Sequence, residues 1–383
     1  MNVLSSVVLV TVLAQARPTP PAPPTAVQEK KPAPAAQGAT PARSTQPAKG
    51  APVGALAQQV ALDRAGFSPG AIDGQAGSST KKALEAHRKQ NGGDPPAGEP
   101  TTQYQITAED AAGPFEPTIP RELPDQAKLP ALSYKTLIEA LAERFHSTPQ
   151  FLKKLNPGAK FAAGEQIVVP NVEPMQLPAA KGKADAKADT TKPADGSTPA
   201  PGATPAPGAK PEPGSKPAPE AKPAPGAKAE ATRGTTGPGQ PGADAPANVV
   251  VTVSKGASAL TVTDPAGKVL MYAPVTSGSS RDPLPIGEWK VNGVSLNPPF
   301  NYNPKLFWDA DPSHTKATIK PGPNNPVGLV WIDLSKEHYG IHGTPEPSTV
   351  GKTQSHGCVR LTNWDAVKLA GLVKPGTKVV FTQ

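Results

Sequence analysis

The residues best suited to chemistry lie close together near the C-terminal end of the sequence. Cys358 is the only cysteine, and it closely follows two of the six histidines, His342 and His356. A thiol becomes a strong nucleophile only as a thiolate, so it needs a base or a cation close by. The two motifs are Ile341-His342-Gly343-Thr344 and Ser355-His356-Gly357-Cys358-Val359-Arg360. They predict a cysteine nucleophile that is served by a histidine.

The spacing of these residues predicts how they meet. His356 and Arg360 are each two positions from Cys358, so in an extended strand all three side chains point to one face. His342 lies in a different predicted strand, from which its ring can reach the sulfur. Gly357 has no side chain, which lets a substrate carbonyl approach backbone N–H groups, the usual donors of an oxyanion hole. Arg360 is suited to pairing with a substrate carboxylate.

Two other interpretations of these residues stay open at this point. A lone cysteine is most often a small buried hydrophobe. Zinc could be bound by Cys358, His342 and His356, but one cysteine and two histidines at this spacing match no common structural zinc pattern. We therefore expect neither a metal nor another cofactor.

Residues 248 to 383 resemble the YkuD-type L,D-transpeptidase domain, and the resemblance extends beyond the two motifs. The further matching stretches are Pro285-Ile286-Gly287-Glu288-Trp289, Asn297-Pro298-Pro299, Pro321-Gly322-Pro323-Asn324-Asn325-Pro326-Val327-Gly328 and Tyr339-Gly340. The resemblance implies that Cys358 is the nucleophile and that His342 moves its proton. It also implies that the Gly343 carbonyl orients the His342 ring, that His356 supports the site, and that N–H groups at Gly357 and Cys358 hold the oxyanion. Arg360, Ser355, Tyr339 and Thr344 are the residues expected to contact substrate.

The reaction implied by the resemblance is ping-pong acyl transfer on peptidoglycan. Cys358 would attack the third residue of a donor stem peptide, release the terminal D-amino acid, and pass the acyl group to an amine of a second stem peptide. Water as acceptor would make the site a carboxypeptidase, and an amine on an envelope protein would make it a protein-anchoring enzyme. The family's thiolate reacts with carbapenems, so covalent inhibition at Cys358 is expected.

Two rival functions stay open beside this one. A sortase-like transpeptidase also carries histidine, cysteine and arginine in this order, although the Ser-His-Gly-Cys motif argues against it. A non-enzymatic wall-binding scaffold would depend on the N-terminal modules alone, and Cys358 would then be dispensable.

The elements that position these residues are predicted to form a mainly β domain over 248–383, sandwich-like with one helix. Alternating apolar residues predict strands at 249–253, 260–263, 269–272, 288–291, 329–334, 339–342 and 378–381. Asp264-Pro265-Ala266-Gly267 predicts a turn. A helix with Asn363 as its N-cap is expected to follow the cysteine motif.

Composition indicates that the rest of the chain is not one globule. The 383 residues include 52 prolines and 36 glycines, with aromatic residues at only 4%. Such a chain lacks the apolar side chains for a single large core, so we expect small domains on disordered tethers. The tethers are assigned to 17–52 and to 174–246, where Pro-rich hexads ending in lysine favour a polyproline II spacer.

Two small modules are expected between the tethers. Residues 53–95 resemble the helical peptidoglycan-binding repeat through Gln59, Leu62, Gly66, Phe67, Gly70, Ile72, Asp73, Gly74, Gly77 and Thr80, with Thr80 as a possible cap of the second helix. His87 stands where that family often has an aromatic residue. Residues 130–172 resemble a LysM-type module, with a helix around Leu137–Phe145, a helix start at Ser147-Thr148-Pro149 and a strand at 166–170. Its first strand is poorly marked.

The N-terminus and the net charge indicate where the protein acts. Residues 1–16 form a short apolar run that ends in Ala14-Gln15-Ala16, which predicts a signal peptide and export to the periplasm or cell envelope. An uncleaved membrane anchor is the alternative. The net charge of +8 favours an anionic partner. No basic patch is interleaved with aromatic residues, so peptidoglycan (stem peptides and glycan strands) is the expected partner and nucleic acid is not.

Overall fold

The structure is a computed structural model that describes residues 53–176 and 246–383. All of these residues belong to one compact unit of the chain, 47–383. The predicted signal peptide and the first tether lie outside the described residues, as does nearly all of the second tether. Among the described residues, no helix is long and apolar enough to cross a membrane.

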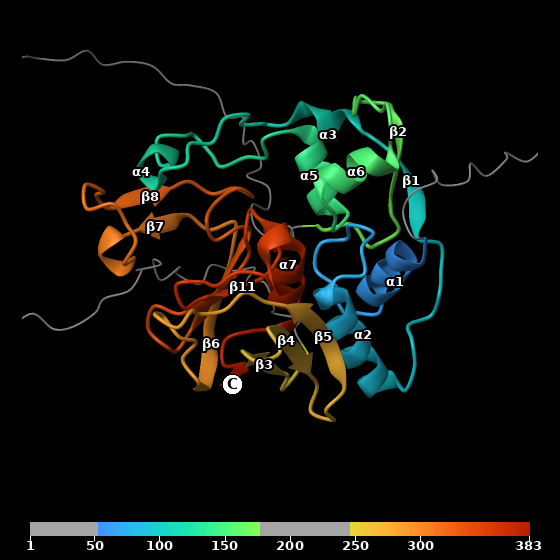
Figure 1. The fold of residues 1–383 in the computed structure, drawn as a ribbon. Coiled ribbons are helices and arrows are strands. Elements are labelled where there is room, and N and C mark those ends of the chain that lie inside the picture. Colours follow the sequence, from blue (N-terminus) through green and yellow to red (C-terminus); the bar gives the residue numbers. More distant parts are fainter. Residues whose placement is uncertain (1–52, 177–245) are drawn as a thin grey trace, which may run out of the picture. The chain divides into compact units, whose positions relative to one another are not determined.

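One mixed sheet of eight strands forms the C-terminal domain, in the order β11-β10-β9-β6-β12-β3-β4-β5. Figure 1 shows β3, β4, β5 and β6 in the lower part of the view. The strands are β3 (Val250–Ser254), β4 (Ala259–Thr263), β5 (Val269–Pro274), β6 (Gly287–Leu296), β9 (Val330–Leu334), β10 (Gly340–His342), β11 (Val359–Arg360) and β12 (Lys378–Thr382). The β10–β11 and β12–β3 pairs are parallel, and the other neighbours are antiparallel.

The long strand β6 explains why this single sheet encloses a core. Its first half pairs with β12, and its second half pairs with β9. A register shift between Val291 and Gly293 separates the two halves, and such bulges bend a strand and increase its twist. Apolar residues from both halves therefore meet in one cluster. The prediction of a mainly β domain is confirmed. The predicted sandwich-like arrangement is instead one curled sheet, because β6 pairs with β12 in its first half and with β9 in its second.

Helix α7 (Asn363–Leu372) packs against the core of this sheet through Ala366, Leu369 and Ala370. Its N-cap is Thr362, whose side chain accepts a hydrogen bond from the Asp365 N–H. The prediction of Asn363 as N-cap was therefore wrong by one residue. Asn363 is instead fully buried, and its amide bonds to Leu329 N–H and to the Pro323 carbonyl.

A small hairpin stands apart from the main sheet. β7 (Phe300–Tyr302) and β8 (Ala317–Ile319) pair antiparallel and enclose the 3-10 helix η1 (Pro304–Leu306). We call residues 300–319 the flap. A second 3-10 helix, η2 (Pro347–Thr349), lies in the loop between β10 and β11.

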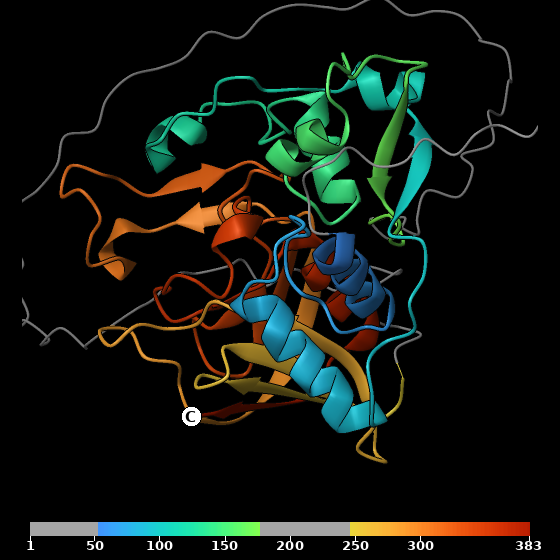
Figure 2. The ribbon, with the colours of Figure 1, turned by 45° about the vertical axis from the view of Figure 1, so that its right-hand side comes forward.

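Residues 53–95 contain two helices, α1 (Val53–Arg64) and α2 (Ser78–Asn91), as the sequence predicts. The turn between them is held by Gln59, whose carboxamide accepts from Gly74 N–H and donates to Asp73. Thr80 lies inside α2, and Gly77 is the N-cap, so the suggested cap at Thr80 was wrong. Phe67 and Leu62 pack with Tyr272 of β5, and α2 lies against β5 (Figure 2).

Residues 101–170 form a second layer of short elements. They are β1 (Thr101–Gln105), α3 (Ala108–Ala112), α4 (Leu123–Gln126), α5 (Leu137–Arg144), α6 (Pro149–Leu155) and β2 (Gln166–Pro170). Thr148 caps α6 with Pro149 at its first turn, as predicted. The partner of β2 is β1, which begins well before the range 130–172 that the sequence indicated. β1 is polar and mostly accessible, so no alternation of apolar residues marks it.

Candidate active site

The strands β10 and β11 bring the two motifs together. They pair in parallel, with Ile341 opposite Val359 and His342 opposite Arg360. Ile341 and Val359 are fully buried in the core of the sheet. Because side chains alternate along a strand, His342 and Arg360 project from the other face. Cys358 comes just before β11, two residues ahead of Arg360.

A cavity of about 690 Å³ opens on this side of the sheet. Cys358, His342 and Arg360 line it together with Ser355 and His356. Its other walls come from the flap, from neighbouring loops and strands, and from the start of α4 with the two residues before it. They are Arg121, Glu122, Leu123, Phe300, Tyr302, Leu306, Phe307, Asp309, Ala310, Asp311, Pro312, His314, Pro326, Val327, Trp331 and His338. The cysteine is therefore accessible from a space large enough for a peptide-sized ligand.

His342 is held in one tautomer by its own neighbour. Its Nδ1 lies 2.7 Å from the Gly343 carbonyl oxygen, which only accepts, so Nδ1 carries the proton and Nε2 is left as the basic nitrogen. Trp331 stacks on the ring at 5.6 Å between centroids. Burial and then the charge of Arg360 lower the pKa of His342 to about 3. The imidazole is thus neutral at ordinary pH, which is the state of a proton acceptor.

The backbone around Cys358 is fixed by close contacts. The Ser355 hydroxyl donates to the Cys358 carbonyl at 2.6 Å. Gly357 has φ +108°, and a Cβ at this position would lie 2.9 Å from the Tyr339 ring. Only glycine suits both this positive φ and the close approach of the Tyr339 ring. Gly357 therefore determines the backbone conformation just before Cys358. The Cys358 sulfur also lies 3.9 Å from the His338 carbonyl.

The predicted site residues divide into two groups. Cys358, His342, His356, Arg360 and Ser355 line the cavity. Tyr339, Thr344, Gly343 and Gly357 are buried and are absent from its lining. The Thr344 hydroxyl accepts from the Glu346 N–H, and Tyr339 packs on Gly357, so both lie behind the cavity wall.

His356 faces the flap. Its Nε2 donates to Asp309 at 2.8 Å, and its ring contacts Phe307 and Trp308. These contacts tie the cysteine motif to the residues between β7 and β8.

Several cavity residues carry no signal that sequence reasoning could use. Trp331 lies in a predicted strand, but its contact with His342 depends on the β9–β10 register. Asp309 and His338 lie in loops without a motif. Arg121, Glu122 and Leu123 come from far along the chain, before the domain that holds the cysteine.

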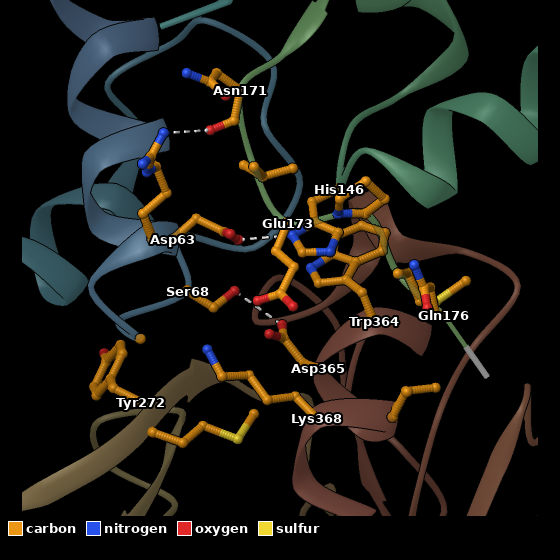
Figure 3. Close-up of a pocket in the computed structure, with 17 residues that line it drawn as sticks. Asp63, Ser68, His146, Asn171, Glu173, Gln176, Tyr272, Trp364, Asp365 and Lys368 are labelled. Carbon is orange, nitrogen blue, oxygen red and sulfur yellow. Dashed lines mark hydrogen bonds and ion pairs between the residues drawn. The ribbon is translucent and has the colours of Figure 1, made fainter. Parts of the chain in front are cut away.

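A second cavity, of about 640 Å³, lies where α1, the 171–176 segment and α7 meet (Figure 3). In it the Asp63 carboxylate pairs with the His146 ring at 3.0 Å, and the Ser68 hydroxyl donates to Asp365 at 2.9 Å. His146 stacks on Trp364 at 5.3 Å. None of the predicted site residues lies here. Within the described ranges, no group of three or more histidine, cysteine, aspartate or glutamate side chains is arranged to hold a metal.

Comparison with known families identifies the C-terminal domain. Residues 248–381 match the YkuD family model, the L,D-transpeptidase catalytic domain. The C-terminal part of the chain therefore carries an L,D-transpeptidase catalytic domain, and the match includes no residue before 248.

Similar proteins carry the same class name. A Bacillus licheniformis protein named as an L,D-transpeptidase, YkuD, is 51% identical over 63 residues, which are 16% of this chain and 38% of that protein. Bacillus subtilis YqjB, also named as an L,D-transpeptidase, is 33% identical over 28% of this chain and 57% of its own length. The chain thus spans less than two thirds of these relatives. A solved L,D-transpeptidase from Mycobacterium smegmatis aligns at 20% identity with a TM-score of 0.30, covering 36% of this chain and 59% of that one.

Proposed function

We propose that this protein is an exported L,D-transpeptidase that forms or remodels cross-links between peptidoglycan stem peptides through an acyl-enzyme on Cys358. One observation carries the proposal: paired strands place Cys358 and a neutral His342 on the wall of one open cavity. The match of 248–381 to the L,D-transpeptidase catalytic domain supports the same reaction class.

The first half-reaction transfers the acyl group to the enzyme. The Cys358 thiol gives its proton to His342 Nε2, and the thiolate attacks the carbonyl carbon of the third residue of a donor stem peptide. The C–N bond to the terminal D-amino acid breaks, and its amine leaves with the proton from His342. A thioester on Cys358 remains.

The second half-reaction releases the acyl group. A side-chain amine of a second stem peptide loses a proton to His342 and attacks the thioester. An amide forms, the C–S bond breaks, and His342 returns the proton to sulfur. The neutral state of His342 suits it to accept a proton in both halves.

The surroundings of the two residues favour the charged species of this mechanism. Arg360 faces the same cavity. In this proposal its guanidinium stabilises the Cys358 thiolate and pairs with a carboxylate of the donor stem peptide. Backbone N–H groups at Gly357 and Cys358 are the proposed oxyanion donors, because they adjoin the nucleophile that lines the cavity. Ser355, Tyr339, Thr344 and His356 act in this proposal by shaping the substrate groove.

The remaining features of the proposal concern the rest of the chain. Residues 53–95 and 130–172 are proposed to bind the wall polymer that carries the substrate, and the N-terminal segment is proposed to direct export to the envelope. Water or an envelope-protein amine would use the same acyl-enzyme with a different acceptor. We propose the stem-peptide amine as the acceptor, because the family model describes a transpeptidase.

Incubation with purified disaccharide-tetrapeptide, followed by mass spectrometry, tests the proposal. The native protein is expected to give cross-linked dimers, and Cys358→Ala is expected to give none. A carbapenem is expected to add covalently to Cys358 of the native protein. Cross-linking by a folded Cys358→Ala variant would contradict the nucleophile, and hydrolysed monomer alone would indicate a carboxypeptidase.

A further inference from the structure

Part of the wall of the Cys358 cavity comes from outside the catalytic domain. Arg121, Glu122 and Leu123 line it, although the family match covers only 248–381. They belong to residues 117–132, which we call the cap segment. The cap segment contains α4, and α4 lies beside β8 of the flap in both ribbon views (Figures 1 and 2).

Side-chain contacts hold the cap segment on the flap. Leu123 and Leu129 pack with Tyr302 and Ile319 in one apolar cluster, which also includes the fully buried Leu132. At its polar edge, the Glu122 carboxylate lies 3.4 Å from His314 Nε2. The other ring nitrogen of His314 bonds to the Tyr302 hydroxyl at 3.0 Å.

Backbone contacts fix the end of the cap segment on the loop after the flap. The Leu132 N–H donates to the Pro321 carbonyl, and the Asn324 N–H donates to the Leu132 carbonyl, each at 2.9 Å. A Cβ on Gly322 would lie 2.2 Å from the Leu132 carbonyl oxygen, so this contact is possible only with glycine there. The cap segment is thus held from both the flap and the loop that follows it.

The carboxylates that line the cavity have partners within the protein, whereas the arginine of the cap segment has no ion-pair partner among the described residues. The three carboxylates are each engaged: Glu122 with His314, Asp309 with His356, and Asp311 with Ser313. Arg121 is exposed at the cavity and, within residues 53–176 and 246–383, forms no ion pair. A guanidinium without an internal partner at the wall of a cavity is available to a ligand carboxylate, which it can bind through two hydrogen bonds.

We propose that Arg121 is a substrate-binding residue of the catalytic cavity, which pairs with a free carboxylate of the peptide substrate, and that the cap segment makes the enzyme selective for anionic peptides. This rests on the proposed function, because the anionic peptide is the donor or acceptor stem of that reaction. Selectivity is then set by a residue that the catalytic domain alone does not contain.

The test compares two stem tetrapeptides that differ only in one free α-carboxylate and its carboxamide. Arg121→Gln is expected to raise KM for the carboxylate peptide roughly tenfold and to leave kcat for that peptide nearly unchanged. The kinetic constants for the carboxamide peptide are expected to stay nearly the same. Arg121→Lys is expected to recover part of the loss. The matched control is Lys128→Gln, which removes an exposed cation just beyond α4 that pairs with Asp125 and does not line the cavity.

Calorimetric titration of both peptides into the Cys358→Ala protein and into the double variant Arg121→Gln/Cys358→Ala separates this inference from the proposed function. A carboxylate preference that disappears with Arg121→Gln supports the inference even if the native enzyme turns over neither peptide. Equal weakening of both peptides, or no change in either, would overturn it. Melting curves of each variant show that it is folded.

Discussion

At the scale of single residues, the site depends on how a buried imidazole and a half-buried guanidinium share one cavity. His342 loses basicity because burial disfavours its charged form and because Arg360 lies nearby. The pKa of Arg360 is lowered by burial, while Cys358 and Glu346 oppose that shift. Arg360 thus contributes, after burial, to the neutral state of His342, and it also interacts electrostatically with Cys358.

This balance predicts a pH effect of Arg360→Gln. Removing the guanidinium charge raises the pKa of His342 above its native value of about 3, so the base becomes protonated, and inactive, at a higher pH. The acid limb of carbapenem acylation of Cys358 is expected to move upward in the variant. Rates of adduct formation by mass spectrometry between about pH 3 and 8 measure the limb. A limb that stays in place or moves downward would show that Arg360 does not set this pKa.

At the scale of elements, the start of α7 joins three parts of the site. Thr362 caps the helix and directly follows Leu361, whose N–H bonds to the His342 carbonyl. Asn363 fills the space between the loop before β9 and the end of β10, since a Cβ on Gly328 or Gly343 would lie 2.0 or 2.1 Å from its Oδ1. The start of the helix thus contacts the backbone at His342 and at Gly343.

Loss of this cap is expected to destabilise the domain. The Thr362 hydroxyl accepts from the Asp365 N–H and donates to its carboxylate at 2.7 Å, and the residue is fully buried. Thr362→Ala is expected to lower the free energy of unfolding by about 1–2 kcal/mol, measured by urea denaturation. Thr136→Ala, at the exposed cap of α5, is the comparison and should have a smaller effect. A loss at Thr136 as large as that at Thr362 would contradict this account.

At the scale of the whole described unit, residues from 53–176 contact the catalytic domain directly. Tyr272 of β5 exchanges backbone hydrogen bonds with Gly66 and Ser68. In the second cavity, the Asp63–His146 pair stacks on Trp364 of α7, and Ser68 donates to Asp365 (Figure 3). Composition alone suggested separate small domains, but these contacts join 53–176 to the catalytic domain in one compact unit.

The junction is expected to depend on pH through Asp365. This carboxyl is 2% exposed, and burial, with Asp63 adding to it, raises its pKa to about 6. The folded protein therefore binds this proton more tightly than the unfolded chain, whose pKa is near 3.8. That stabilisation is complete below about pH 4 and is lost as pH rises through about 6.

Asp365→Asn removes this titration. Relative to the native protein, the variant is expected to gain stability as pH rises from about 4 to 7, by up to about 3 kcal/mol. Urea unfolding of both proteins across this range gives the difference in their free energies of unfolding at each pH. The contribution of His342 cancels from this difference because both proteins contain it. A difference that does not change with pH would contradict a raised pKa at Asp365.

Local pattern was sufficient for much of the catalytic domain. Alternating apolar residues located β3, β4, β5, β6, β9, β10 and β12, whereas the short strands β7, β8 and β11 were not predicted. The turn at 264–267 has the expected bond from Gly267 N–H to the Asp264 carbonyl. The extended strand expected from His356 to Arg360 is only Val359–Arg360 in the structure, although Cys358 and Arg360 line the same cavity. The cap of α7 was missed by one residue, because Thr362 and Asn363 are both good capping residues and only the helix geometry selects between them.

By itself, then, the sequence determined which residues form the two motifs, that the His342 motif lies in a strand, and which family the two motifs resemble. The tertiary structure alone decided that Trp331 stacks on His342, that β1 pairs with β2, and that Arg121 shares a cavity with Cys358. The physical reason is the sequence separation over which each interaction acts. Periodicity and capping are set by neighbours along the chain, whereas register and the packing of distant segments depend on which surfaces complement each other in the folded protein.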